Sequence, residues 1–303
     1  MKTDTSTSHI TTALIPAAGQ GKRLHPHTIN RPKCLIDAGD KPLLAHTIEA
    51  LEKNGYERLI LITGHCHRQV DAFLEQYNTT LDVQTVYNDR YDTTNNIYSV
   101  WLAGSLIRDA FLLLESDLIF DAGAIATMNR PNRIALDRYN PGKHTGTTAA
   151  VTSDNRLAEL HVGGIDMVQA HRKNGHMPTA PCQNPPGKFS HRASRKGLSC
   201  SNQSEKPTDR HHHTLYKTVN MCTFCISTWH RLHHAISSRL AAGYQHDFYE
   251  LAVRDLLIGG AISLEMADFS GLWWDEIDCT NDLARVEARL SGASKKVSRY
   301  EAG

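Results

Sequence analysis

Short apolar runs alternate with helical patterns through about the first 125 residues, and this alternation is the feature that most limits what the chain can fold into. Three apolar runs are typical of buried strands, residues 13–15, 59–62 and 111–114, and a further strand is predicted at residues 83–87. Three segments carry apolar side chains at helical spacing: residues 43–52, residues 68–77 and a segment that begins near Asn96. Such strands between helices are typical of a parallel sheet covered on both faces. The sequence therefore predicts an α/β fold with a mostly parallel central sheet.

The second half of the chain is less regular. Strands are predicted at residues 147–151, 159–162, 217–224 and 264–266, and helices at residues 227–242, 247–258 and 281–290. Between residues 170 and 213, polar residues, Pro and Gly replace almost all aliphatic ones, so this stretch cannot bury enough apolar area to offset its ordering entropy. We expect a disordered N-terminal tail at residues 1–11 and one domain over residues 12–303, interrupted by a flexible insertion at about 170–213.

The charge balance restricts the classes of partner. With 33 Lys and Arg against 32 Asp and Glu, the net charge is +1, which gives no overall field to attract nucleic acid or an anionic membrane. The sequence has no run of about 18 apolar residues that could span a membrane, and its polar first residues show no signal-peptide pattern. We therefore expect a cytoplasmic protein that binds neither nucleic acid nor membrane. No oligomeric state follows from the sequence.

Seven cysteines are scattered along the chain, and an odd number of this kind is typical of free thiols in a reducing compartment. Cys222 and Cys225 form a CxxC pair, so a zinc site is the alternative. The sequence holds no second CxxC to complete such a site, and residues 219–224 have the pattern of a strand. Both observations favour free thiols.

A loop of small residues directly follows the first predicted strand: Pro16, Ala17, Ala18, Gly19, Gln20 and Gly21. Small residues let backbone N–H groups approach phosphate oxygens, and Lys22 and Arg23 add positive charge, so the loop is a candidate phosphate cradle. It is not a P-loop, because Pro16 and Arg23 stand where that motif needs glycine and a hydroxyl residue. Leu24 likewise breaks the dinucleotide fingerprint. A tight turn without a ligand would explain the two glycines alone about as well.

A second cationic pair, Arg31 and Lys33, follows this loop, and together they give the pattern AAGxGxRLxPxTxxRPKxL. This pattern resembles the signature of the sugar-phosphate nucleotidyltransferase superfamily. Further segments resemble its branch of LicC-type phosphocholine cytidylyltransferases and phosphonate cytidylyltransferases: residues 87–99, 115–117, 217–220 and 276–278. The resemblance covers residues 12–169 and 214–290. It implies a Rossmann-like three-layer sandwich of the nucleotide-diphospho-sugar transferase type, with a mixed, mostly parallel central sheet.

The resemblance also implies roles for individual residues. The nucleotide is held by the glycine loop and the Asn-Asn stretch, the latter lining the base pocket: Ala17, Ala18, Gly19, Gly21, Lys22, Asn95 and Asn96. Arg23 and Lys33 bind the triphosphate and the incoming phosphate, and Lys217 is placed to meet the acceptor. Asp117 and Asp278 match the two metal-binding aspartates, with Mg²⁺ as the implied cofactor.

Elementary chemistry agrees with the two aspartates. Asp117 lies just past a predicted buried strand, where open α/β sheets bind ligands. Asp278 follows a short run at residues 273–277, and its alternative role is the N-cap of the next helix. Mg²⁺ prefers oxygen ligands and needs only one or two carboxylates when phosphate and water complete its shell. Two aspartates from distant strands would therefore suffice.

The predicted reaction is the transfer of CMP from CTP to a small phosphate or phosphonate, such as phosphocholine or 2-aminoethylphosphonate, with release of pyrophosphate. It requires alignment and charge neutralisation but no covalent nucleophile. Trp273 and Trp274 could stack on a trimethylammonium group, which would favour phosphocholine, although core packing is the commoner role of tryptophan. Lys217 favours a phosphonate, and we lean toward that acceptor.

Two alternatives remain at this point. A sugar-1-phosphate nucleotidyltransferase that uses UTP or dTTP is disfavoured, because residues 93–96 read Thr-Thr-Asn-Asn where such enzymes carry a Gly-Thr-Ala-like run. A catalytically inactive, nucleotide-sensing homologue would be marked by loss of a site residue. The four that matter most are all present: Arg23, Lys33, Asp117 and Asp278.

Overall fold

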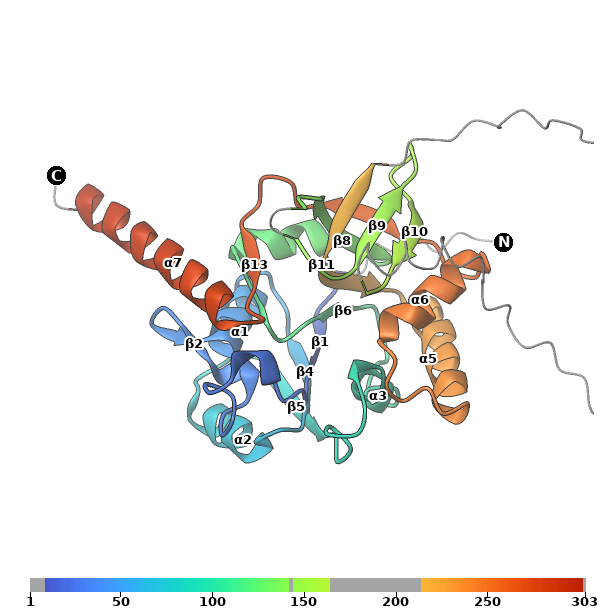
Figure 1. Ribbon diagram of the computed structural model, residues 1–303, viewed down its shortest axis with the longest axis horizontal. Helices are drawn as coiled ribbons and strands as arrows, with labels where there is room; N and C mark the ends of the chain where they lie inside the picture. Colours follow the sequence, from blue (N-terminus) through green and yellow to red (C-terminus); the bar gives the residue numbers. More distant parts are fainter. Residues whose placement is uncertain (1–8, 142–143, 164–213, 302–303) are drawn as a thin grey trace, which may run out of the picture.

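The computed structural model describes residues 9–141, 144–163 and 214–301 (Figure 1). The predicted insertion at about 170–213 lies outside these residues. Among the described helices, none is both long and apolar enough to cross a membrane. Every strand and helix predicted from the sequence is present, with shifted ends.

A mixed sheet forms the centre of the molecule, with the strand order β10-β9-β11-β6-β1-β4-β5, while β8 pairs with both β11 and β12. Its strands are β1 (Thr12–Ala17), β4 (Arg58–Thr63), β5 (Asp82–Tyr87), β6 (Phe111–Leu114), β8 (Arg133–Arg138), β9 (Thr148–Val151), β10 (Leu157–His161), β11 (Leu215–Phe224) and β12 (Glu265–Asp268). The strands of the first half, β6, β1, β4 and β5, pair in parallel, and β11 adds antiparallel pairs with β6, β8 and β9. The predicted α/β class with a mixed sheet is confirmed.

Helices cover both faces of this sheet and make three layers (Figure 1). They are α1 (Leu43–Lys53), α2 (His67–Gln76), α3 (Asn96–Leu102), α5 (Ile226–Ala241), α6 (Tyr249–Ile258) and α7 (Thr280–Glu301). Successive side chains of a strand point to opposite faces, so Ile15 packs in one core cluster with Ile48 of α1. Leu14 packs in the other cluster with Val100 of α3 and Leu232 of α5. Burial on both faces explains why these strands are apolar throughout.

Two short strands that the sequence did not predict position the site. They are β7 (Leu118–Phe120) and β13 (Trp274–Glu276), which pair antiparallel outside the central sheet. The six residues of β8 also escaped prediction, because Arg133, Asp137 and Arg138 interrupt its apolar pattern. Two further short strands, β2 (Asp37–Ala38) and β3 (Lys41–Pro42), form a separate pair.

The predicted boundary of the N-terminal tail is wrong. Ile10 is only 1% exposed and belongs to the core cluster that contains α1. The carbonyl of Thr11 accepts hydrogen bonds from the backbone N–H groups of Glu57 and Arg58. The packed part of the chain therefore begins before residue 12, because an apolar side chain at Ile10 reaches the core.

Candidate active site

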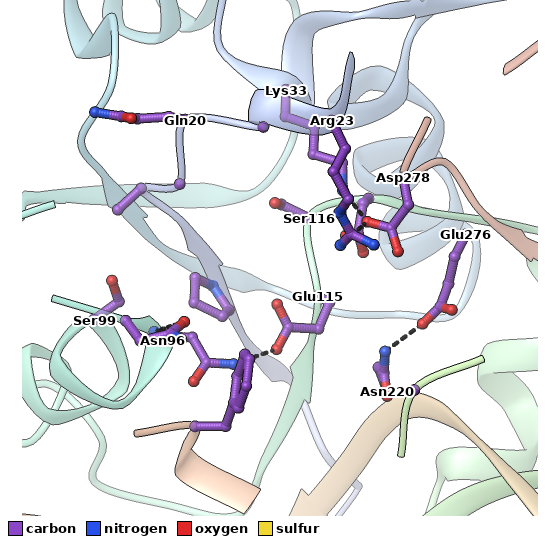
Figure 2. Close-up of a pocket in the computed structure, with 18 of the residues that line it drawn as sticks. Gln20, Arg23, Lys33, Asn96, Ser99, Glu115, Ser116, Asn220, Glu276 and Asp278 are labelled. Carbon is purple, nitrogen blue, oxygen red and sulfur yellow. Dashed lines mark hydrogen bonds and ion pairs between the residues drawn. The ribbon is translucent and has the colours of Figure 1, made fainter. Parts of the chain in front are cut away.

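A cavity of about 840 Å³ lies where the glycine loop after β1 faces the end of β6 and the middle of β11 (Figure 2). It brings together segments that are distant in sequence: residues 18–23, 94–96, 115–117, 145–147, 248–250 and, singly, Lys33, Lys217, Asn220, Glu276 and Asp278. Ligand sites at the carboxyl ends of parallel strands are usual in α/β sheets. The cavity is therefore the candidate active site.

The glycine loop lines this cavity as predicted, with one exception. Ala18, Gly19 and Gly21 face it, and so does Lys22. Ala17 is not among the described residues that line the cavity, because it is the last residue of β1 and is buried at 5% exposure in the core. The side chain of Ala17 is therefore structural, and its predicted role in holding the nucleotide is not supported.

Gly21 has a backbone requirement. Its φ is +60°, a left-handed conformation that glycine adopts without strain. A Cβ at this position would lie 3.2 Å from Thr28 Cγ2 and 3.3 Å from Lys33 Cβ. Because Gly21 has no side chain, the loop can pack closely against Lys33 Cβ.

The pairing of β7 with β13 brings the two predicted metal-binding aspartates together. Asp117 directly precedes β7, Asp278 closely follows β13, and the Ile277 N–H donates to the Asp117 carbonyl at 3.0 Å. Lys33 Nζ lies 2.6 Å from Asp117 Oδ2 and 2.8 Å from Asp278 Oδ1. Arg23 donates to the same Asp278 oxygen at 2.8 Å. Four of the predicted site residues thus form one cluster of alternating charge (Figure 2).

Electrostatics in this cluster favour a charged lysine. Burial disfavours the charged form of Lys33, but the carboxylates of Asp117 and Asp278 outweigh it and raise the pKa of Lys33 above its ordinary value. Asp117 Oδ1 is buried and has no hydrogen-bond partner among the described residues. A buried carboxylate oxygen that keeps a free lone pair is chemically suited to a hard cation such as Mg²⁺.

Asp278 does not act as the N-cap of α7. The backbone N–H groups of Asp278 and Cys279 both donate to Asp282 Oδ2, at 3.1 and 2.8 Å. Asp282 therefore satisfies the start of the helix, while the Asp278 carboxylate faces Arg23 and Lys33. The alternative raised from the sequence is wrong for this residue.

Lys217 also lines the cavity, with its side chain only 2% exposed. Its Nζ donates to the Thr218 carbonyl at 2.6 Å and lies 3.4 Å from Glu276 Oε1. Glu276 accepts a further, short hydrogen bond from Asn220 Nδ2 (Figure 2). Burial raises the pKa of Glu276 to about 7, although Lys217 opposes the shift.

Asn95 and Asn96 line the cavity, but their side chains are engaged inside the protein. Asn95 caps α3 and donates to the His246 carbonyl at 3.2 Å. Asn96 Oδ1 accepts from the Tyr249 N–H at 3.0 Å, and its amide donates to Glu115 at 3.1 Å and Glu250 at 3.5 Å. The pair thus joins the start of α3 to the start of α6. Its predicted contact with a nucleobase stays a prediction.

Sequence reasoning gave no role to four polar residues that line the cavity: Asn220, Glu115, Glu250 and Glu276. Three of them stand in motifs that carried the resemblance, within two or three residues of a predicted site residue. Glu250 lies in the first turn of α6, and no motif of the sequence marked it. Burial, with Glu250 and Asp117 nearby, raises the pKa of Glu115 well above its ordinary value.

Neither Trp273 nor Trp274 is among the described residues that line the cavity. Trp274 is 3% exposed and its Nε1 donates to Asp137 Oδ2 at 2.9 Å, while the Arg289 guanidinium lies 4.8 Å from the ring centre of Trp273. The positions of both residues fit the alternative of core packing better than stacking on a ligand.

The described cysteines are free, and the described residues hold no group of three or more His, Cys, Asp or Glu that could bind a metal.

Comparison with known proteins defines the class first. Residues 12–139 match the family model described as nucleotidyl transferase. The branch follows from individual relatives. The chain is 36% identical over 108 residues to the choline-phosphate cytidylyltransferase of Streptococcus pneumoniae, which is 36% of this chain and 45% of that protein. It is 30% identical over 163 residues to the 2-aminoethylphosphonate cytidylyltransferase of Lancefieldella rimae, with 53% and 65% covered.

A third relative matches almost the whole chain. The CMP-5'-(3-aminopropyl)phosphonate synthase of Streptomyces rubellomurinus is 26% identical over 281 residues, covering 92% of this chain and 38% of that protein. The chain spans less than half the length of the first curated relatives that it matches, between 34% and 45%. The resemblance to the cytidylyltransferase branch, drawn from the motifs, is confirmed.

Solved structures show the same fold. The CTP:phosphocholine cytidylyltransferase LicC of Streptococcus pneumoniae superposes with a TM-score of 0.66 at 20% identity, covering 93% of this chain and all (100%) of that one. A UDP-glucose pyrophosphorylase complexed with UDP-glucose superposes with a TM-score of 0.63 at 12% identity, with 94% and 99% covered. The predicted Rossmann-like architecture of the nucleotide-sugar transferase type is therefore confirmed.

Proposed function

We propose that the protein is a cytidylyltransferase that transfers CMP from CTP to a small phosphonate or phosphate and releases pyrophosphate. The observation that carries this proposal is the cluster in which Lys33 joins Asp117 and Asp278 opposite the glycine loop. Relatives named for phosphocholine and for aminophosphonates support the nucleotide and the class of acceptor.

The charged residues of the cavity would have two roles: the cations would bind phosphates and the carboxylates would bind a metal ion. The backbone of Gly19 and Gly21 would bind the triphosphate together with Lys22 and Arg23, because small residues and cations suit phosphate oxygens. Asp117 and Asp278 would hold Mg²⁺, which when bound neutralises phosphate charge and helps to orient the leaving pyrophosphate. With the cation bound, the ammonium group of Lys33 would contact the phosphates in place of the carboxylates.

The transfer itself is a single displacement. An acceptor oxygen forms a bond to the α-phosphorus of CTP, the bond to the β-phosphate oxygen breaks, and its electron pair leaves with pyrophosphate. The chain supplies alignment of two anions and cationic groups that oppose their repulsion. Lys217, which also lines the cavity, is proposed to meet the acceptor anion.

The structure bears on the choice of acceptor. Neither Trp273 nor Trp274 lines the cavity among the described residues, and the Lys217 ammonium already lies 5.8 Å from the ring centre of Trp274, so neither ring is placed to receive a trimethylammonium group. This supports a phosphonate such as 2-aminoethylphosphonate over phosphocholine. A cytoplasmic location is part of the proposal and is supported by the free thiols among the described cysteines.

The proposal is tested by a matrix of substrates. The four ribonucleoside triphosphates are each combined with Mg²⁺ and with 2-aminoethylphosphonate, phosphocholine or glucose 1-phosphate, and pyrophosphate release is measured. We expect release with CTP and a phosphonate or phosphocholine. Turnover only with the hexose phosphate would identify a sugar-1-phosphate nucleotidyltransferase. CTP binding without pyrophosphate release across the panel would identify an inactive nucleotide sensor.

A further inference from the structure

β11 is irregular where it passes the cavity. Its pairing with β8 shifts between Thr218, opposite Leu136, and Cys222, opposite Ile134, so β11 holds two residues more than β8 across this stretch. On its other edge β11 pairs first with β9, through Leu215–Lys217, and then with β6, through Met221–Phe224. Residues 218–220 thus lie at a bulge between two neighbouring strands, where a strand commonly redirects its side chains.

Asn220 is the residue at which the bulge turns. Its φ is +57°, a left-handed conformation that costs most residues other than glycine about 1–2 kcal/mol. Glycine would satisfy this backbone without strain, and asparagine tolerates it better than most. The backbone alone therefore does not explain why the position carries an amide.

The side chain of Asn220 is fixed at both ends. Oδ1 accepts from the Thr218 hydroxyl at 2.9 Å, which sets the orientation of the amide, and Nδ2 donates to Glu276 Oε1. The backbone carbonyl of Asn220 accepts from the Glu115 N–H at 3.2 Å. One residue thus contacts both acidic segments, the one that leads to Asp117 and the one that leads to Asp278.

Glu276 is the carboxylate that Asn220 shares with Lys217. The same Oε1 atom accepts from Asn220 and lies 3.4 Å from Lys217 Nζ. The hydrogen bond from Asn220 fixes the position of the Glu276 carboxylate (Figure 2). Without it, the carboxylate is free to rotate onto Lys217 and pair with it fully, because the lysine has little water around it to compete.

We infer that Asn220 is a positioning residue: its amide fixes Glu276 and thereby keeps the Lys217 ammonium available for the anion of the acceptor. This inference rests on the proposed function, in which Lys217 meets the acceptor. Loss of the amide should therefore weaken acceptor use and leave CTP binding unchanged, since Asn220 does not contact the glycine loop among the described hydrogen bonds.

Three variants separate the effect of the Asn220 amide from the effect of its backbone conformation. Asn220→Gly keeps the left-handed conformation without strain and removes the amide, Asn220→Ala removes the amide and adds strain, and Asn220→Asp replaces the donor with an acceptor. We expect Asn220→Gly to fold, to lose less Tm than Asn220→Ala because it adds no strain, and to keep the KM for CTP. Its kcat/KM for the acceptor should fall by about 10- to 100-fold, the range found when a residue supporting a site residue is lost. Full acceptor activity in Asn220→Gly would overturn the inference.

Asn155 provides the matched control. It also has a positive φ, +61°, but it lies in the turn before β10 and is exposed away from the cavity. Asn155→Gly should leave Tm and both KM values unchanged. If it lowered acceptor activity as much as Asn220→Gly, the effect would come from the loss of a left-handed asparagine in general, and the inference would be wrong.

A readout without activity keeps the inference testable if the proposed function fails. Wild-type protein that releases no pyrophosphate with any acceptor would refute the proposed function alone. The link itself is then measured by the Tm of Asn220→Ala, Glu276→Ala and the double variant. We expect the double variant to lose less than the sum of the single losses, because contacting residues are not additive. Additive losses would show that the amide does not hold Glu276.

Discussion

Asp117 and Asp278 accept hydrogen bonds from one ammonium group, that of Lys33, at 2.6 and 2.8 Å. The three residues come from segments distant in the sequence, and the two aspartates meet because β7 pairs with β13. Each carboxylate lowers the cost of burying the lysine, and the lysine separates two like charges. This arrangement needs the complete fold, so it links the stability of the site to the chemistry proposed for it.

Replacing Asp117 by asparagine should abolish most of the transfer. The amide has the size of the carboxylate but lacks its charge, so neither Lys33 nor a cation is held as before. We expect turnover to fall by at least about 100-fold, as for lost transition-state contacts, while the fold is retained. Pyrophosphate release is the measurement. Asp121→Asn, at an exposed aspartate outside the cavity, is the control, and equal activity in both variants would remove Asp117 from the site.

Lys33 should compete with a divalent cation for the two aspartates. Lys33→Met removes a positive charge within hydrogen-bond distance of both carboxylates. Without nucleotide, Mn²⁺ should bind this variant at least about tenfold more tightly than wild type, because nearby charges interact strongly inside a protein. Electron paramagnetic resonance of free Mn²⁺ gives the affinity. Lys22→Met, which changes an exposed cation beside the glycine loop, should bind Mn²⁺ as wild type does. An unchanged Mn²⁺ affinity in Lys33→Met would contradict the competition.

Glycine substitutions in the loop should separate stability from binding. Gly21→Ala forces a left-handed alanine against Thr28 and Lys33, so we expect a loss of about 1–2 kcal/mol in the free energy of unfolding. A Cβ at Gly19 meets nothing within 4 Å, but it enters the cavity. Gly19→Ala should therefore keep its stability and bind CTP more weakly. Denaturant unfolding and calorimetric titration check the two effects, and a destabilised Gly19→Ala variant would show that the loop is described wrongly.

Cys225 should react as a thiolate near neutral pH. Burial disfavours its ionisation, but hydrogen bonds that its sulfur makes with Ser227, Thr228 and Asn132 outweigh this and lower the pKa of Cys225 to about 7. Alkylation of Cys225, followed by mass spectrometry, should rise through pH 7 and level off above it. A rise centred near pH 9 would contradict the lowered pKa.

The same pKa has a consequence for stability. A thiol whose pKa is lower in the folded than in the unfolded state stabilises the fold fully above the unfolded value, 9.0, and loses this contribution as the pH falls through about 7. The Tm difference between wild type and Cys225→Ser should therefore grow from pH 7 to pH 9. A difference that is constant over this interval would refute the linkage.

The sequence predicted the strands and site residues that local patterns mark, but not the contacts that depend on how the strands pair. Apolar runs marked β1, β4 and β6 because buried parallel strands are apolar on both faces. Asp117 and Asp278 were found because motif positions lie at strand ends. The roles of Asn220 and Glu250 were not found, because neither a bulge nor a helix contact across the cavity leaves a periodic signal in the sequence. Ala17 ends β1 and does not line the cavity among the described residues, which the motif could not show because it does not mark the last residue of the strand.

The most direct test of the central claim is ³¹P nuclear magnetic resonance of wild-type protein incubated with CTP, Mg²⁺ and 2-aminoethylphosphonate. The account predicts a new phosphonate–phosphate anhydride signal that appears together with pyrophosphate in equal amount, as the signals of CTP and the free phosphonate decline. Pyrophosphate without the anhydride, or unchanged CTP under conditions in which CTP is bound, would contradict it.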